Sequence, residues 1–229
     1  MKRSLRLLFL ASMLVFAVPA RADIFLLGFT GFDYEDPDLN AGTYLAVNDG
    51  YKAVGFITSV GPMLAPYYDE TTYEYTFYLF GLTVATRVFD APSQTLFVTF
   101  NDNARTRYYR DPFVGGTPAV YGVNPPNATA PSTFTNGLLV LGGDVDDFTL
   151  FYDFFFDEGN TSGAMTQDEG DFFDNGYVNP VGGWTLAGLL GRPNATIPQG
   201  YDNQLEGECV IRPVPAAHKT WGAIKKTYR

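Results

Sequence analysis

The sequence predicts an all-β fold, either a β-sandwich or a jelly roll. Apolar and polar residues alternate in several short segments, and turns rich in Gly, Pro, Asn and Asp separate these segments. No interior segment keeps the spacing of an amphipathic helix over three turns, which an α/β fold would require. Many short strands joined by regular turns are typical of sandwiches and jelly rolls.

The expected strands follow from this two-residue period. Residues 73–89 alternate, and their apolar positions shift by one residue after Gly81, which predicts a β-bulge. Residues 95–100 alternate without interruption. The other expected strands are residues 24–30, 51–60 and 137–143.

The segment 144–159 combines acidic and aromatic residues. Read as a strand up to Asp157, it places most of its acids on the solvent face, where they protect an aromatic strand against edge pairing. A second interpretation is a carbohydrate site, since Phe151 and Phe155 flank Asp153 on that face and rings beside a carboxylate can bind a sugar. The candidate ligand-binding residues are Phe151, Asp153 and Phe155.

The segment 157–176 is expected to be a solvated acidic loop. Calcium is the cofactor that suits the composition, because it prefers oxygen ligands, and Asp168, Asp171 and Asp174 recur at every third position. Their spacing does not fit the EF-hand loop. Both interpretations stay open here, a solvated loop and a calcium site of these three aspartates.

Charge is distributed unevenly along the chain. All 25 acidic residues lie between Asp23 and Glu208, whereas residues 212–229 contain only basic charges. An acidic body repels nucleic acid and anionic lipid, so neither is an expected partner. Three arginines in residues 103–112 are expected to pair with nearby acids on an exposed edge strand.

Missing residue types exclude several chemistries. The single histidine, His218, lies in the basic tail, so the body has no imidazole for a Ser-His-Asp or Cys-His mechanism or for a histidine-ligated metal. Phosphate-binding and dinucleotide-binding motifs are also absent from the sequence. The sequence therefore favours a non-enzymatic protein, and carboxylate-dependent glycan chemistry of the hydrolase or lyase type is the alternative.

The N-terminus predicts export. Basic residues precede the apolar run 7–18, and a small-x-small cleavage site follows it at Ala20–Ala22. The expected organisation is a signal peptide (1–22), an all-β domain (23–211) and a proline-linked basic tail (212–229), with no membrane span in the mature chain. The single cysteine, Cys209, is expected to be a buried thiol.

The chain ends in "TWGAIKKTYR" (220–229), in which Trp221, Ile224 and Tyr228 would share one face of a short helix. This ending resembles a basic tail found on exported proteins of poorly characterised bacteria. It is also similar to bacterial C-terminal sorting tails that begin with Val-Pro, but it lacks their hydrophobic membrane segment. The resemblance implies recognition by an export or attachment machinery; a basic tail lying on the acidic body is the alternative.

Together these observations predict a secreted or cell-surface β protein with a structural, adhesive or glycan-binding role. Its expected partners are a glycan or another cell-surface component. A concave groove lined by aromatic rings and two close acids would favour the glycan-active enzyme. A flat or filled sheet with scattered acids would favour the structural role.

Overall fold

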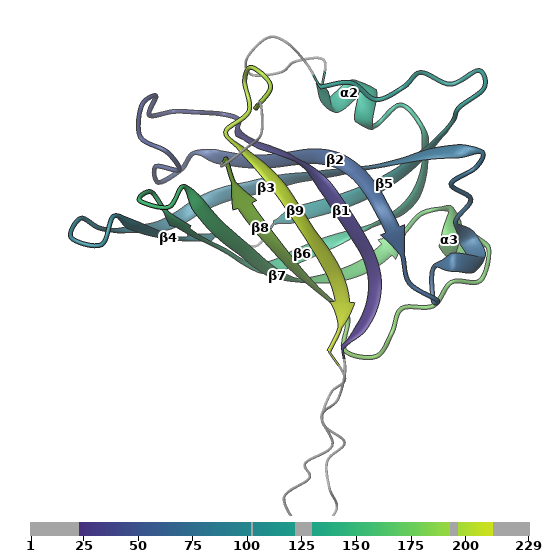
Figure 1. Cartoon of the computed structure of the whole chain (residues 1–229). Helices are drawn as coiled ribbons and strands as arrows, with labels where there is room; N and C mark the ends of the chain where they lie inside the picture. Colours follow the sequence, from purple (N-terminus) through teal and green to yellow (C-terminus); the bar gives the residue numbers. More distant parts are fainter. Residues whose placement is uncertain (1–22, 102, 122–129, 193–196, 213–229) are drawn as a thin grey trace, which may run out of the picture. The chain divides into compact units, whose positions relative to one another are not determined.

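A computed structural model describes residues 23–101, 103–121, 130–192 and 197–212. Residues Ile24–Arg212 form one unit, and the chain's second unit consists almost entirely of residues outside the described ranges. The predicted signal peptide and, apart from Arg212, the predicted basic tail lie outside the described residues. The strands in Figure 1 are β1 (Ile24–Glu35), β2 (Gly50–Val60), β3 (Tyr73–Asp90), β4 (Thr95–Phe100), β5 (Ala104–Pro112), β6 (Leu138–Asp153), β7 (Glu158–Glu169), β8 (Trp184–Gly191) and β9 (Asn203–Ile211). The short helices are η1 (Ala65–Tyr67), α2 (Ala130–Phe134) and α3 (Asp171–Asp174).

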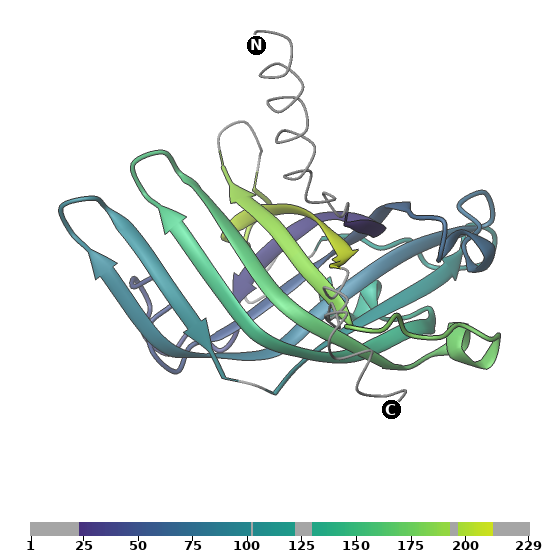
Figure 2. The same cartoon turned by 90° about the horizontal axis from the view of Figure 1, so that it is seen from below.

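These strands form a closed, antiparallel barrel (Figures 1 and 2). If β4 is left aside, each of the other eight strands pairs with the next one along the chain. Strand β9 pairs with β1 and closes the ring. The gap between β3 and β6 is filled end to end by two short strands: β5 pairs with one half of each long strand, and β4 pairs with the other half. The described barrel therefore has no unpaired sheet edge.

The all-β class is confirmed, but the expectation of a β-sandwich or jelly roll is wrong. A sandwich requires two sheets, whereas the described strands make one continuous sheet. Closure depends on the pairing of β1 with β9, from Ile24 opposite Ile211 to Asp33 opposite Asn203. Alternation along one strand is the same in a sandwich and in a barrel, so the sequence pattern does not reveal this long-range pairing.

The predicted bulge in β3 is confirmed. Leu79 and Leu82 are both buried, and they pair with Ala53 and Tyr51 across a shift in register. Gly81, between them, has φ of +85°, a left-handed conformation that glycine adopts without a steric penalty. The extra residue keeps apolar side chains inside the barrel on both sides of the bulge.

The expected loop at residues 157–176 is wrong, because most of it is β7. The inward residues of this strand are Thr161, Gly163, Met165 and Gln167, which alternate correctly but are mostly small or polar. Because these inward residues are not strongly apolar, the alternation in this segment does not predict a strand. Three acids of this segment, Glu158, Asp168 and Glu169, belong to β7, whereas Asp171 and Asp174 belong to α3.

Aromatic and aliphatic side chains fill the barrel interior. Phe29 meets Phe77 edge to face at 5.3 Å between ring centroids, and Tyr51 lies against both Phe100 and Phe148. An interior void among the described side chains has a volume of about 10 Å³, enough for about one water molecule. Filled interiors are usual for eight-stranded barrels, so a ligand would bind at an end or on the outer face.

A second, smaller apolar cluster covers the outside of β1, β2 and β3. Tyr34, Val54 and Phe134 form its buried centre, and Thr76 Oγ1 donates a hydrogen bond of 2.8 Å to the Phe134 carbonyl of α2. From Phe29 onward, odd and even residues of β1 thus face two different sides, with Phe29 in the main core and Phe32 and Tyr34 in the smaller cluster.

Cys209 is buried inside the barrel beside Tyr108, as the sequence predicted. Burial raises the pKa of its thiol to about 12, which makes it an unreactive packing residue. Among the described residues, no helix combines the length and the apolar character needed to cross a membrane.

Candidate functional site

The predicted carbohydrate residues Phe151, Asp153 and Phe155 do not share one strand face. Strand β6 ends at Asp153, and Phe155 lies in the turn before β7, so the expected continuation of the strand to Asp157 is wrong. Asp153 Oδ1 accepts hydrogen bonds from the backbone N–H groups of Phe155 and Phe156, at 2.9 and 3.1 Å. Its carboxylate therefore stabilises the turn.

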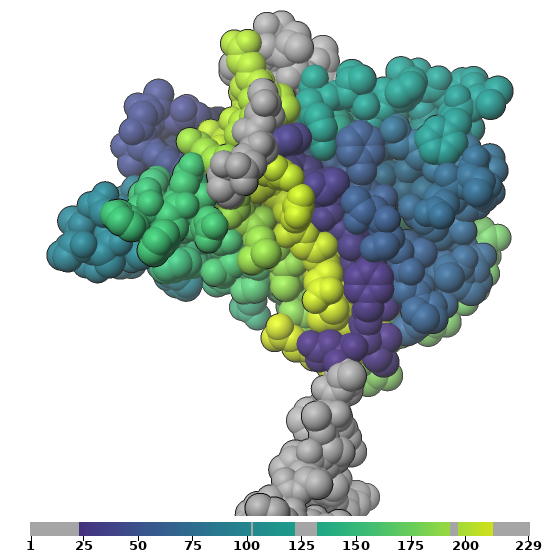
Figure 3. Space-filling model, in the orientation of Figure 1, coloured from purple at the N-terminus to yellow at the C-terminus, as the bar shows by residue number. Residues whose placement is uncertain are grey.

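Phe151 does lie on the outer face of the barrel, in a row of exposed apolar side chains. Its cross-strand neighbour on β4 is Phe97, which pairs in turn with Val88 of β3. On its other side, Phe151 pairs with Asn160, which lines a shallow groove of about 810 Å³ on the face formed by β2, β1, β9, β8 and β7. Figure 3 shows this face, with β9 in yellow beside β1 in purple. Glycan binding at Phe151 stays a prediction.

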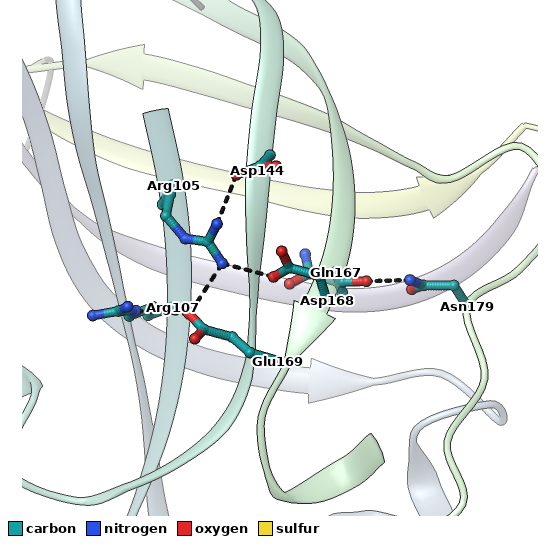
Figure 4. A network of polar contacts seen from close by, with 7 residues as sticks. All are labelled: Arg105, Arg107, Asp144, Gln167, Asp168, Glu169 and Asn179. Atoms are coloured by element: carbon teal, nitrogen blue, oxygen red, sulfur yellow. Dashed lines mark hydrogen bonds and ion pairs between the residues drawn. The ribbon is translucent and has the colours of Figure 1, made fainter. Parts of the chain in front are cut away.

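The arginines of β5 pair with acids, as expected, although β5 is not an edge strand because it pairs with both β3 and β6. Arg105 contacts Asp144 at 2.7 Å, Asp168 at 2.6 Å and Glu169 at 3.2 Å, and Arg107 contacts Glu169 at 2.9 Å (Figure 4). These side chains are partly exposed, so each pair contributes little stability.

Two of the three aspartates predicted to bind calcium are engaged by these arginines. Asp168 pairs with Arg105, and Asp171 pairs with Arg110 at 3.0 Å. Asp174 is exposed at the end of α3. The three do not form a group of mutually close carboxylates in the described part of the chain. A calcium site at these positions has no geometric support and stays a prediction.

A different group of acids converges at one end of the barrel. Carboxylate oxygens of Glu35, Asp38 and Asp49 all lie within 4.8 Å of one another. Two of these acids stabilise the loop 36–49: Asp49 accepts hydrogen bonds from the N–H groups of Leu39 and Ala46, at 3.0 and 2.8 Å, and Glu35 accepts one from Leu45 at 2.7 Å. The loop is thereby folded against the barrel end.

This loop forms one wall of a pocket of about 370 Å³, which we call the acidic pocket. The pocket lies where β1 and β8 end, where β9 begins, and where the β6–β7 turn folds over the barrel end. Its lining residues are Glu35, Asp38, Gly42, Thr43, Tyr44, Tyr152, Phe154, Asp157, Arg192, Asp202 and Asn203.

Three rings form an aromatic wall of the acidic pocket. Tyr152 and Phe154 lie edge to face at 5.0 Å between centroids, and Tyr44 is 5.8 Å from Tyr152 and 6.3 Å from Phe154. Tyr152 is buried, whereas 40% of the Phe154 surface is exposed. The aromatic wall therefore combines the buried Tyr152 ring with the Phe154 ring, which is open to solvent.

A buried polar network lies beneath the pocket. Asp33 is completely buried, and its Oδ1 accepts hydrogen bonds from the Asn203 backbone N–H at 2.7 Å and from the Asn203 side-chain amide at 3.2 Å. The same amide nitrogen donates to the Tyr44 hydroxyl at 2.7 Å. Burial, together with the charge of Asp202, raises the pKa of Asp33 to about 7 despite the hydrogen bonds from Asn203.

The lining carboxylates also affect one another. Burial raises the pKa of Glu35 to about 8, and the charges of Asp202, Asp49 and Asp38 add to this shift, while the hydrogen bond from Leu45 opposes it. Burial also raises the pKa of Asp202, whose Oδ2 accepts a hydrogen bond of 3.1 Å from the Glu35 N–H. Glu35 in the pocket therefore keeps its proton at neutral pH.

The sequence pattern did not predict this site. Strand β1 was expected to end at residue 30, but its inward alternation continues through Gly31, Asp33 and Glu35. The signal was an acid at every second position after a hydrophobic strand. Because Asp202 and Asn203 join the site from the other end of the sequence, the pocket depends on barrel closure.

No protein-family model matches the chain, and no curated protein or solved structure is similar to it. The function must therefore be argued from the geometry of the acidic pocket.

Proposed function

We propose that this chain is an exported, non-enzymatic binding protein of the cell surface or extracellular space, and that its acidic pocket binds a glycan. One observation carries the proposal: a concave pocket of about 370 Å³ combines an aromatic wall with several carboxylates. Aromatic rings can pack against the apolar face of a sugar, while carboxylates accept hydrogen bonds from its hydroxyls.

The remaining lining groups fit the same ligand. Arg192 is exposed and supplies a guanidinium donor, and a Cβ atom on Gly42 would meet no atom within 4 Å. The filled barrel interior supports binding at this end, because a sugar has no room among the core side chains.

The proposal is tested by replacing Phe154 with Ala. Phe154 lines the pocket and is 40% exposed, so its replacement removes a ligand contact. We expect the Kd of a glycan identified on an array to rise about fivefold, since an aromatic contact contributes about 1 kcal/mol. Calorimetric titration measures this change.

The matched control is Phe155→Ala, since Phe155 lies in the same turn, is 76% exposed and does not line the pocket. Its glycan affinity should stay unchanged. The proposal is wrong if the wild-type protein binds no glycan, or if both variants lose affinity equally.

A carboxylate-dependent, glycan-active enzyme is the second candidate, and the raised pKa of Glu35, about 8, favours it. A carboxyl group that keeps its proton at neutral pH can act as a general acid, and Asp38 lies close enough to act with it. Release of new reducing ends or of unsaturated sugars from a bound glycan, abolished by Glu35→Gln, would establish the enzyme. Binding without any product supports the binding protein.

The basic tail, residues 212–229, is proposed to be a sorting or docking signal read by an export or attachment machinery. Its support is the uniform positive charge and the aromatic residues Trp221 and Tyr228. Deleting residues 213–229 should leave the protein in the culture medium or inside the cell instead of on the surface, as cell fractionation would show. Unchanged surface attachment would contradict this role.

A further inference from the structure

The acidic pocket contains more carboxyl groups than its basic side chains could neutralise if all of them were ionised. Four of its lining residues are carboxylic acids, and Arg192 is the single Lys or Arg among the described lining residues. Arg192 Nε already donates to the Asp202 backbone carbonyl at 2.7 Å. Asp33 and Asp49, both completely buried, add further acidic groups next to the pocket.

This imbalance has an energetic consequence. Carboxylates that are buried and close to one another ionise only at a cost, because neither water nor a counter-charge stabilises the anions. The raised pKa values of Glu35 and Asp33 are an expression of this cost. A positively charged ligand group would remove it and would gain attraction to several carboxylates at once.

One buried acceptor in the same pocket also lacks a donor. Asn203 is 1% exposed, and its Nδ2 is bonded to Asp33 and Tyr44, but its Oδ1 has no hydrogen-bond partner. A buried amide oxygen without a donor costs free energy. An N–H group of a ligand in the pocket that Asn203 lines would supply the donor.

The aromatic wall distinguishes between two kinds of cation. A divalent metal would use oxygen ligands, but both Asp49 oxygens and one Glu35 oxygen already accept backbone N–H groups. An ammonium group instead uses both features of the pocket, since it donates hydrogen bonds to carboxylates and is attracted to the faces of Tyr and Phe rings. Tyr44, Tyr152 and Phe154 all line the pocket, and Phe154 is the most exposed of the three rings.

We propose that the ligand of the acidic pocket is an amino sugar with a free, protonated amine. This inference rests on the proposed glycan-binding function and specifies its ligand class. The ammonium group lies among Glu35, Asp38, Asp157 and Asp202, and the sugar ring packs against the exposed face of Phe154. N-acetylation of the amine removes the charge and therefore most of the affinity.

The experiment compares three probes of equal length with the mature full-length protein: a glucosamine oligosaccharide, its fully N-acetylated form and an unsubstituted glucose oligosaccharide. Calorimetric titration is carried out at pH 6.5 and low salt. We expect the free amine to bind at least about tenfold more tightly than either neutral probe, and this difference to shrink at 0.5 M NaCl.

Two conservative variants test the site. Asp157→Asn removes one lining charge but suits the left-handed backbone at this position, where φ is 57°. Asp38→Asn removes a second charge at an exposed position and preserves the acceptor for the Asn40 N–H. Each should weaken binding of the amine about threefold to tenfold, clearly more than it weakens binding of the neutral probes. Asp174→Asn, an exposed charge in α3 outside the pocket, is the control.

The outcomes separate the two proposals. Equal affinity for all three probes, weakened by Phe154→Ala, overturns the amino-sugar inference and keeps the glycan site. Tighter binding of the amine that none of the pocket variants changes also overturns it, since the cation then binds elsewhere. No binding of any probe, or of any array glycan, overturns the proposed function itself.

Discussion

Gly207 shows how closely the barrel strands approach one another at single residues. A Cβ atom on Gly207 would lie 2.3 Å from the Ala187 carbonyl oxygen and 2.6 Å from the Phe29 ring. Gly207 pairs with Gly188, and this pair of small residues lets the Phe29 ring lie against the wall. The barrel wall is therefore thin at this point, and the core residue depends on it.

Replacing Gly207 with Ala should destabilise the protein by about 2–3 kcal/mol, because backbone atoms of β8 would have to move. Chemical denaturation measures the change. Gly28→Ala is the control, since its nearest obstacle is the exposed Ser59 hydroxyl, which can rotate away. Equal losses for both variants would contradict the argument.

Asp33 makes the stability of the protein depend on pH. In the folded state it keeps its proton up to about pH 7, whereas in the unfolded chain it ionises near its ordinary value of 3.8. Between these values the folded state binds more protons, so the free energy of unfolding falls as the pH rises.

Asp33→Asn should therefore be more favourable at high pH than at low pH. Relative to the wild type, its free energy of unfolding should increase by on the order of 3 kcal/mol between pH 4 and pH 8. Denaturation at several pH values measures this difference. A constant difference at all pH values would show that Asp33 has an ordinary pKa in the folded protein.

At the scale of elements, the loop 36–49 depends on one buried carboxylate. Asp49 is completely buried and accepts hydrogen bonds from Leu39, Ala46 and the Asn40 side chain. These bonds replace the strand pairing that the loop lacks. Without them, backbone N–H groups near the barrel end would lose their acceptor.

Asp49→Ala should destabilise the protein by about 2–4 kcal/mol and should release residues 39–46 to faster hydrogen exchange. Exchange followed by mass spectrometry locates the effect, and glycan affinity should fall with it. Asp90→Ala, at the exposed end of β3, should not change exchange in the loop. Protection of residues 39–46 that survives Asp49→Ala would show that other contacts hold the loop.

At the scale of the whole barrel, β9 joins both neighbouring strands and closes the ring. Its residues pair with β1 on one side and with β8 on the other. Removing it would expose two long strand edges and would open the core around Leu205 and Cys209.

Truncation after Gly200 should therefore abolish cooperative unfolding and cause aggregation, which light scattering and thermal denaturation detect. Truncation after Arg212 preserves β9 and should keep the cooperative transition. A soluble, cooperatively folded chain that lacks β9 would show that ring closure is not needed for folding.

Local features of this barrel could be predicted from the sequence, and long-range ones could not. The alternation of residues 95–100 and the bulge at Gly81 involve positions close in the sequence, so the sequence pattern predicts both. The contact between Asp33 and Asn203 joins residues near opposite ends of the chain, and no local pattern marks it. The acidic pocket consists of such long-range contacts. The alternation of apolar and polar residues therefore predicted a ligand site at Phe151 and Asp153 instead of at the acidic pocket.

The filled core affects how fast a ligand can bind and dissociate. A molecule held at the rim of this cylinder can arrive and leave without any strand separating, so its residence time depends on its contacts with the rim alone. Such an arrangement suits rapid, reversible binding to one end of a large polymer that stays outside the barrel. It does not suit the transport of a ligand enclosed in the barrel.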